Sequence, residues 1–183
     1  MAEAKILIQG FTGDSGEGET CSTITLVRDQ NLIMVVDPGV LASQRLLIEV
    51  LKQEGLTVDD VTHVFITHSH LDHYRNIGMF ATAKTVEHFG IWDKGYCDDR
   101  PEQFTKNIKI IETPGHSYDA LSLLVETDLG TIAVVGDVFW RENYPDNDPY
   151  ASDPEQLSAS RKKILELADY IIPGHGPMYK VKK

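Results

Sequence analysis

Residues 61–73 read Val61-Thr62-His63-Val64-Phe65-Ile66-Thr67-His68-Ser69-His70-Leu71-Asp72-His73. The first half of this segment is rich in β-branched and aromatic side chains, a composition that predicts a buried strand. The second half holds three histidines and one aspartate, and it follows the predicted strand without a gap. Imidazole and carboxylate groups are common ligands of divalent metal ions in proteins. The segment therefore predicts a metal-binding loop at the end of a strand.

Three other motifs place a histidine or an aspartate directly after an apolar run that is typical of a strand. They are Pro114-Gly115-His116, Gly136-Asp137-Val138-Phe139 and Pro173-Gly174-His175-Gly176. Five of the seven histidines fall in three of these places, His68 to His73, His116 and His175, a distribution that chance does not explain. Loops at the ends of adjacent strands can gather residues that are distant in sequence around one ion. We therefore expect the four motifs to converge on one site.

The four motifs supply enough ligands for two adjacent metal ions. The predicted ligands of the first ion are His68, His70 and His116, and those of the second are Asp72, His73 and His175. Asp137 is the predicted carboxylate that bridges the two ions. Two cations about 3.5–4 Å apart lower the pKa of a shared water and generate a hydroxide nucleophile at neutral pH. Asp72 is the predicted catalytic residue, because it is expected to orient that hydroxide as well as to bind metal.

The rest of the chain predicts layers of strands and helices. Strand-like runs lie at residues 5–9, 22–28, 32–36, 84–89, 108–113, 121–126, 131–135 and 170–172. Ser43 and Asp153 are predicted to cap helices, and a short helix is predicted from Tyr74 to Phe80. The segment from Gly10 to Thr20 is rich in glycine and polar residues, which suits a long surface loop that overhangs a pocket. Two groups of strands, each followed by helices, must stack to bury their apolar faces.

In this order and spacing, the four motifs resemble those of the metallo-β-lactamase superfamily, and the resemblance spans residues 5 to 180. It implies a single domain over residues 1–183 with an α/β (α+β) fold, a four-layer αββα sandwich. The number of imidazoles favours two Zn²⁺ ions, and a site of histidines and carboxylates also suits Mn²⁺ or Fe²⁺. Asp37, in Asp37-Pro38-Gly39, matches an acidic residue of the family on an early strand. The match implies that Asp37 supports the metal loop without binding metal itself.

Within the superfamily, the segment from Gly136 to Pro177 resembles a branch of compact stand-alone domains. For the animal relatives, that resemblance implies RNA cleavage in the maturation of histone transcripts. The enzymes that hydrolyse β-lactams place Cys or a non-bridging residue where this chain has Asp137, so antibiotic hydrolysis is not the expected activity. Flavodiiron oxygen reductases carry His-x-Glu-x-Asp as their first motif. This chain has His68-Ser69-His70 there, so it departs from that branch.

Composition restricts the partners and the location that we expect. The chain carries 17 Lys and Arg against 28 Asp and Glu, a formal net charge of -11 that repels polyanions at long range. Cys21 and Cys97 are far apart in sequence and predict neither a disulfide nor a thiolate zinc site. No segment is long and apolar enough to span a membrane, so we expect no membrane partner and a cytoplasmic location, or a nuclear one in a eukaryote. Nothing in the sequence excludes a homodimer.

The predicted activity is hydrolysis of an ester, a thioester, a lactone or a phosphodiester, so the substrate is a small molecule or RNA. The family resemblance favours RNA, and the net charge disfavours it. Two alternatives stay open, namely a persulfide dioxygenase-like oxidoreductase with a single iron and a non-catalytic metal-binding module. Ser117, directly after His116, and His88, after the metal-loop helix, are candidate substrate-binding residues.

Overall fold

The strands form because apolar side chains along them alternate between two apolar environments. In β9 (Leu121–Thr127), Leu121 and Leu123 pack into one hydrophobic cluster, and Leu124 packs into another on the opposite face. This alternation with a period of two is the signature of a strand that is covered on both sides. The computed structural model describes residues 1–13 and 18–182 of the chain.

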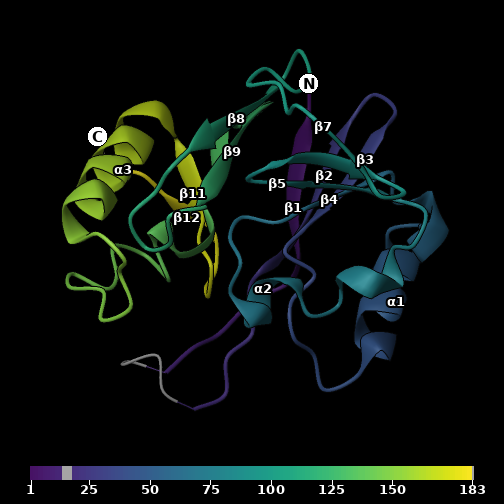
Figure 1. Ribbon diagram of the computed structural model, residues 1–183, viewed down its shortest axis with the longest axis horizontal. Helices are drawn as coiled ribbons and strands as arrows, with labels where there is room; N and C mark the ends of the chain where they lie inside the picture. Colours follow the sequence, from purple (N-terminus) through teal and green to yellow (C-terminus); the bar gives the residue numbers. More distant parts are fainter. Residues whose placement is uncertain (14–17, 183) are drawn as a thin grey trace.

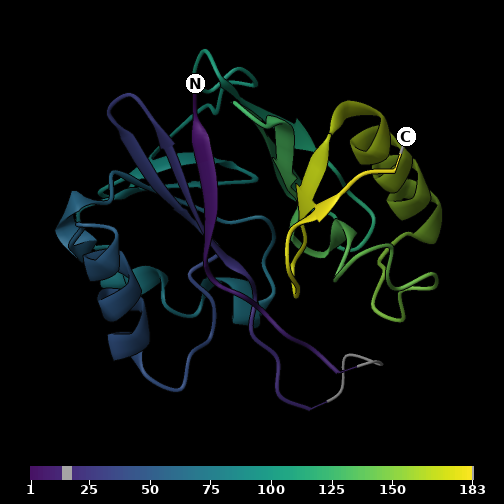
Figure 2. The ribbon, with the colours of Figure 1, turned by 180° about the vertical axis from the view of Figure 1, so that it is seen from behind.

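Two sheets pack face to face (Figures 1 and 2). The seven-stranded sheet has the order β1-β2-β3-β4-β5-β6-β7, and the five-stranded sheet has the order β12-β11-β10-β9-β8. The strands of the first sheet are β1 (Glu3–Ile8), β2 (Ile24–Asp29), β3 (Leu32–Val36), β4 (His63–Phe65), β5 (Lys84–Glu87), β6 (Gly90–Asp93) and β7 (Tyr96–Asp98). Those of the second sheet, besides β9, are β8 (Ile108–Glu112), β10 (Gly130–Val134), β11 (Tyr170–Ile172) and β12 (Tyr179–Lys180).

Helices cover the outer face of each sheet. The helix α1 (Gln44–Gln53) buries Leu47 and Leu51 against the seven-stranded sheet, and α3 (Pro154–Leu167) buries Leu157 and Ile164 against the five-stranded sheet. Figure 1 shows these two helices on opposite sides of the molecule with the sheets between them. The third hydrophobic cluster lies between the sheets and includes Phe65 of β4. The predicted αββα sandwich is therefore confirmed.

Both predicted helix caps are present in the structure. The side chain of Ser43 accepts a hydrogen bond from the backbone N–H of Arg45 at 3.2 Å. Oδ1 of Asp153 accepts hydrogen bonds from the N–H groups of Glu155 and Gln156, each at 3.0 Å. Each cap satisfies backbone donors that the first turn of a helix leaves without a partner, and this fixes where the helix begins.

The structure differs from the prediction around the metal loop. The predicted helix from Tyr74 to Phe80 is replaced by α2 (Leu71–Tyr74) and a 3₁₀ turn, η2 (Ile77–Met79). The remaining 3₁₀ turns are η1 (Val58–Asp60) and η3 (Gly136–Val138). The residues after β5 form a hairpin, β6 and β7, which lacks the long alternating apolar pattern that a sequence prediction needs.

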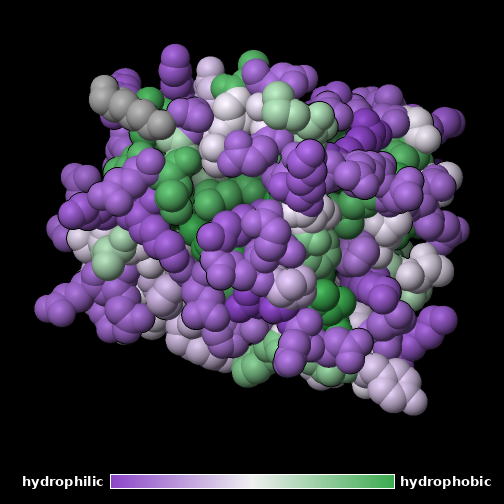
Figure 3. Space-filling view, turned by 90° about the horizontal axis from the view of Figure 1, so that it is seen from above, coloured by the Kyte–Doolittle hydropathy of each residue, from purple (hydrophilic) through white to green (hydrophobic). Residues whose placement is uncertain are grey.

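The end of the molecule that carries the N-terminus is mostly hydrophilic, with a few hydrophobic residues gathered near the middle of the face (Figure 3). Across residues 1–13 and 18–182, the structure contains no helix with the length and apolar character that crossing a bilayer requires.

Candidate metal centre

The metal loop begins at the end of β4, where Asp37 anchors it. β3 and β4 are parallel neighbours, so Asp37, after β3, and Thr67, after β4, emerge at the same edge of the sheet. Thr67 donates to Asp37 twice, from its backbone N–H to Oδ1 (2.8 Å) and from its hydroxyl to Oδ2 (2.7 Å). Oδ2 of Asp37 also lies 2.8 Å from Nδ1 of His73. One buried carboxylate therefore holds both ends of the loop.

A change of backbone conformation within the loop separates its ligands into two pairs. His70 has an extended backbone, and α2 begins at the next residue, so Asp72 and His73 lie on a helical turn. Side chains turn by about 100° per residue in a helix but alternate between two faces in an extended segment. The second pair is thereby directed to a neighbouring position rather than to that of His68 and His70.

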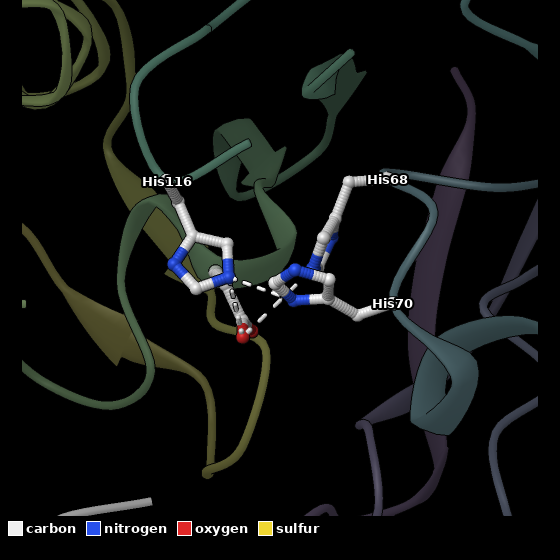
Figure 4. Close-up of side chains that lie close together, drawn as sticks. His68, His70 and His116 are labelled. Atoms are coloured by element: carbon white, nitrogen blue, oxygen red, sulfur yellow. Dashed lines mark hydrogen bonds and ion pairs between the residues drawn. The ribbon is translucent and has the colours of Figure 1, made fainter. Parts of the chain in front are cut away.

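The structure brings the seven predicted ligands together in two groups. The first group contains His68, His70, His116 and Asp137, and the second contains Asp72, His73 and His175. In each group, one ligand atom from every residue lies within 4.8 Å of the others. Figure 4 shows His116 facing His68 and His70, with Nε2 of His116 3.0 Å from Nδ1 of His70.

The carboxylate of Asp137 lies between the two groups. Its Oδ2 is 3.4 Å from Nε2 of His116 and 3.9 Å from Nε2 of His68. Its Oδ1 is 3.3 Å from Nε2 of His73 and 3.2 Å from Nε2 of His175. β10 and β11 are parallel neighbours, which brings Asp137, after β10, beside His175, after β11. Oδ2 also lies 3.3 Å from Nε2 of His175, so His175 contacts both oxygens, and the one carboxylate is in reach of histidines of both groups.

Hydrogen bonds on the outer nitrogens of the histidines determine which nitrogen faces the centre. Nδ1 of His175 lies 3.0 Å from the carbonyl oxygen of Cys21, and Nδ1 of His116 lies 2.6 Å from Oδ2 of Asp148. Nδ1 of His73 contacts Asp37, as described above. A histidine that donates from one ring nitrogen to an oxygen presents the other nitrogen as a metal ligand. These three histidines thus present Nε2 to the centre.

Several atoms at the centre have the properties of unsatisfied metal ligands. Nε2 of His68, Nε2 of His73 and Oδ1 of Asp137 are buried and make no hydrogen bond within the described part of the chain. Leaving a buried polar atom without a partner costs about 1–3 kcal/mol. Imidazole nitrogens and a carboxylate oxygen at one position form a donor set that suits Zn²⁺. The residues present therefore fit divalent ions.

The electrostatics of the centre also favour cations. Burial opposes the charged form of His73, but Asp137 and Asp37 outweigh that effect and raise the pKa of His73 well above its ordinary 6.5. Burial likewise opposes the charged form of Asp137, but His175 and His73 outweigh it and hold the pKa of Asp137 well below 3.8. Burial and the neighbouring His73 lower the pKa of His68 well below 6.5. Asp137 therefore stays ionised at neutral pH and His68 stays neutral, which are the forms that bind metal.

The two groups line a small cavity that opens to solvent. It has a volume of about 180 Å³ and is lined by Thr12, Thr20, His70, Asp72, His116, Asp137, Trp140, Tyr150 and His175. The predicted overhanging segment from Gly10 to Thr20 supplies two of these residues, and its residues 14–17 lie outside the described part of the chain. The hydroxyl of Thr20 donates to Oδ2 of Asp72 at 3.2 Å.

At two glycines of the motifs, neighbouring atoms lie too close to leave room for a side chain. A Cβ at Gly115 would collide with the backbone of Leu157 at the start of α3, and Gly115 also has a φ of 131°, which disfavours other residues. A Cβ at Gly174 would collide with Oδ1 of Asp137. The glycine in each Pro-Gly-His motif therefore allows its histidine loop to pack close to the site.

The structure places both candidate substrate-binding residues outside the lining of this cavity. The hydroxyl of Ser117 donates instead to Oδ1 of Asp119. The ring of His88 packs edge to face with Tyr118, 5.9 Å between centroids, and lines a separate cavity with Ile66 and Tyr74. The predicted ligand His68 also lines that second cavity, and the substrate-binding roles of Ser117 and His88 stay predictions.

Sequence reasoning missed Asp148, Thr20 and Tyr150. Asp148 contacts a predicted ligand, and the other two line the cavity. All three lie on irregular segments without a periodic pattern or a motif. Only the position of Thr20, at the end of the predicted overhanging loop, was a signal that could have identified one of them.

Comparisons with known proteins agree with this geometry. The model of the metallo-β-lactamase superfamily matches residues 19–96. Metallo-β-lactamase domain-containing protein 1 of Xenopus laevis is 37% identical over 190 residues, which cover 97% of this chain and 81% of that protein. An N-acyl homoserine lactonase of Bacillus thuringiensis is 28% identical over 144 residues, 66% of this chain and 56% of that protein. The crystal structure of a candidate metallo-β-lactamase from Thermotoga maritima superposes with a TM-score of 0.78 at 25% identity, covering 98% of this chain and 99% of that one.

The sequence match, the shared fold and the cluster of histidines and aspartates lead to one conclusion. The chain belongs to the metallo-β-lactamase superfamily and is a metal-dependent hydrolase.

Proposed function

We propose that this protein is a dinuclear zinc hydrolase that acts on a small, uncharged ester, thioester or lactone. The observation that carries the proposal is the position of Asp137, whose carboxylate lies within 3.9 Å of histidine nitrogens of both groups of ligands. A carboxylate in that position suits a pair of divalent ions close to each other, as in other two-metal hydrolytic sites. A site for a single ion would not need the second group.

Each side chain has a defined role in this proposal. His68, His70 and His116 would hold one ion, Asp72, His73 and His175 would hold the other, and Asp137 would contact both. When bound, the two ions would supply Lewis acidity and lower the pKa of water at the site. Asp72 would orient the attacking water and accept its proton. The hydroxyl of Thr20 donates a hydrogen bond to Oδ2 of Asp72 and so fixes the position of that carboxylate.

The cavity favours a small neutral substrate over a polyanion. Its volume of about 180 Å³ lies below the roughly 300–1,000 Å³ of pockets that enclose drug-sized ligands. None of the described residues that line it is a lysine or an arginine, and the chain has a net charge of -11. Trp140 and Tyr150 supply an aromatic wall against which an apolar substituent can pack. The similarity to a lactonase supports a lactone within this class.

The test is a substrate panel assayed with zinc-loaded protein. The panel contains nitrophenyl esters, an acyl thioester, N-acyl homoserine lactones, bis-nitrophenyl phosphate and an unstructured RNA, and metal content per chain is measured in parallel. We expect two Zn²⁺ per chain and hydrolysis of at least one acyl substrate. The variants His68→Ala and Asp137→Ala should lose about 10²–10³-fold in kcat, because each removes a group that stabilises the transition state.

Other outcomes would overturn the proposal in distinct ways. Cleavage of the RNA alone, lost in both variants, would identify a ribonuclease, and contaminating ribonucleases would survive the substitutions. One iron per chain with oxygen uptake on a persulfide would identify an oxidoreductase. Full metal loading without turnover of any substrate in the panel would favour a non-catalytic metal-binding module.

A further inference from the structure

A buried carboxylate outside the ligand set contacts the first group of ligands. Oδ2 of Asp148 lies 2.6 Å from Nδ1 of His116, and the side chain of Asp148 is 0% exposed. Burying a carboxylate is costly unless charged or hydrogen-bonded partners compensate for its lost hydration. The contact with His116 is therefore a built feature of the site rather than an incidental approach of two surface groups.

The other oxygen of Asp148 holds the chain turn that follows. Oδ1 accepts a hydrogen bond from the backbone N–H of Tyr150 at 2.9 Å, and the carbonyl oxygen of Asp148 accepts one from Ala151 at 3.3 Å. This turn belongs to residues 141–153, the segment that connects η3 to α3 and that we call the connecting loop. One carboxylate thus joins a predicted metal ligand to the loop.

The connecting loop carries part of the cavity wall. Tyr150 stacks on Trp140, with 6.0 Å between ring centroids and 25° between planes, and both residues line the cavity. Trp140 in turn packs edge to face against His116 at 6.4 Å. A shift of Asp148 would therefore move the aromatic wall and His116 together.

The connecting loop also has anchors that do not depend on Asp148. Nη1 of Arg161, on α3, donates to the carbonyl oxygen of Asp146 in the loop at 3.4 Å, and Nε donates to that of Val138, at the end of η3 before the loop, at 2.8 Å. The N–H of Ser152 donates to the carbonyl oxygen of His116 at 3.0 Å. Because these contacts remain, a substitution that removes only the charge of Asp148 should leave the fold intact.

We infer that Asp148 is a positioning residue that orients His116 toward the first ion and places Tyr150 in the cavity wall. The inference rests on the proposed function only in taking His116 as a metal ligand. The carboxylate of Asp148 accepts a hydrogen bond from the Nδ1–H of His116, which leaves Nε2 to bind the ion and makes the ring a better electron donor. An asparagine has one carbonyl oxygen, so it can accept from His116 or from the N–H of Tyr150, but its amide group repels the other donor.

The experiment compares zinc affinities by titration against a competing chelator, without any substrate. Asp148→Asn should weaken one of the two zinc-binding steps by about 10–100-fold, the usual effect of losing a partner of a metal-ligating histidine. His116→Ala marks which step belongs to that position. Asp146→Asn is the matched control, because Asp146 is an exposed acid of the same loop, and the substitution keeps the backbone carbonyl that accepts from Arg161. It should bind both ions as the unsubstituted protein does.

Tryptophan fluorescence tests the link to the cavity wall. The chain has two tryptophans, so Trp92→Phe leaves Trp140 as the only one. Zinc should change the emission of Trp140, and in Asp148→Asn the midpoint of that change should move to higher zinc by the same factor as the affinity. Unchanged zinc affinity in a folded Asp148→Asn protein would overturn the inference. That result would leave the proposed function standing, whereas tight zinc binding with no hydrolysis would overturn the function alone.

Discussion

Oδ2 of Asp37 lies 2.8 Å from Nδ1 of His73, and both side chains are at most 3% exposed. The same oxygen also accepts from the hydroxyl of Thr67, so a single buried carboxylate fixes the ring of His73 and the end of β4. Carboxylates that hold the outer nitrogen of a metal-ligating histidine set both its orientation and its basicity. In the proposed two-ion site, the pair would therefore determine how the second ion is held.

The substitution Asp37→Asn tests that role. We expect zinc affinity at the second position to fall by about 10–100-fold, because asparagine has one acceptor oxygen where Asp37 uses two. Its amide group must therefore face either the N–H of Thr67 or the donors from the Thr67 hydroxyl and His73. Zinc titration against a competing chelator measures the change. Asp128→Asn, at an exposed turn, is the control and should bind zinc normally. Equal affinities in the two variants would contradict the role of Asp37.

Gly174→Ala tests the packing around Asp137. A methyl group at this position meets Oδ1 of Asp137, so the carboxylate must move away from His73 and His175. We expect weaker binding of both ions and a loss of about 1–3 kcal/mol in the free energy of unfolding, the usual cost of overpacking. Chelator competition and urea unfolding measure these effects.

The control for this substitution is Gly78→Ala. A Cβ at Gly78 meets no atom within 4 Å, and its backbone angle is one that alanine adopts. It should leave zinc affinity unchanged. If Gly174→Ala behaves in the same way, Asp137 is not held where the structure places it.

Removal of metal should lower the thermal stability. A ligand that binds only the folded state at one hundred times its Kd adds about 2.7 kcal/mol to the free energy of unfolding. For a chain of this size, that corresponds to a rise in Tm of about 5–10 °C per site. Differential scanning calorimetry with EDTA and with excess Zn²⁺ measures the difference. A Tm that does not respond to zinc would show that the cluster does not bind it.

The stability of the protein should also depend on pH through Asp29, at the end of β2. Burial opposes ionisation of Asp29, but hydrogen bonds from Thr105 and Asn107 outweigh it and lower its pKa below 3.8. A carboxyl group whose pKa is lower in the folded state stabilises that state above its unfolded pKa, and the contribution is lost as pH falls through the folded pKa. Acidification below about pH 4 should therefore remove it.

Urea unfolding of the unsubstituted protein and of Asp29→Asn, each measured from pH 7 to pH 3, tests this prediction. The difference in unfolding free energy between the two should be constant near neutral pH and should shrink as the pH falls below about 4. A difference that stays constant over the whole range would assign the effect of the substitution to packing rather than to charge.

The sequence predicted those parts of the site that follow regular strands. Each ligand motif comes directly after an apolar run, and parallel neighbours such as β10 and β11 bring Asp137 and His175 to one edge. Such a run is readable because its hydrophobicity repeats with the geometry of the strand. The stacking of the two sheets cannot be read from any single apolar segment, and its prediction depended on the resemblance to a family.

The contacts made by irregular segments could not be predicted from the periodicity of hydrophobic residues. Asp148 reaches His116 only because the connecting loop folds back over the motif, and no periodicity encodes that path. The hydroxyl of Ser117, the residue after His116, donates to Asp119, and the role of Ser117 in substrate binding stays a prediction. The helix predicted from Tyr74 to Phe80 was misplaced, since α2 ends at Tyr74 and only the short 3₁₀ turn η2 follows it.

The ligands come from both halves of the sandwich. His68, His70, Asp72 and His73 extend from the seven-stranded sheet, whereas His116, Asp137 and His175 extend from the five-stranded sheet. Ions held between them would cross-link the two sheets at the end of the sandwich that carries the ligands. The backbone hydrogen bond from Leu121 to Thr67 joins the two sheets at the same end. Removing the metal would then weaken the contact between the two sheets and not only the cavity itself. Backbone amides at that end should exchange with deuterium faster in the chelated protein, while those near Ala2 and Glu126, which are hydrogen-bonded to each other, keep their protection.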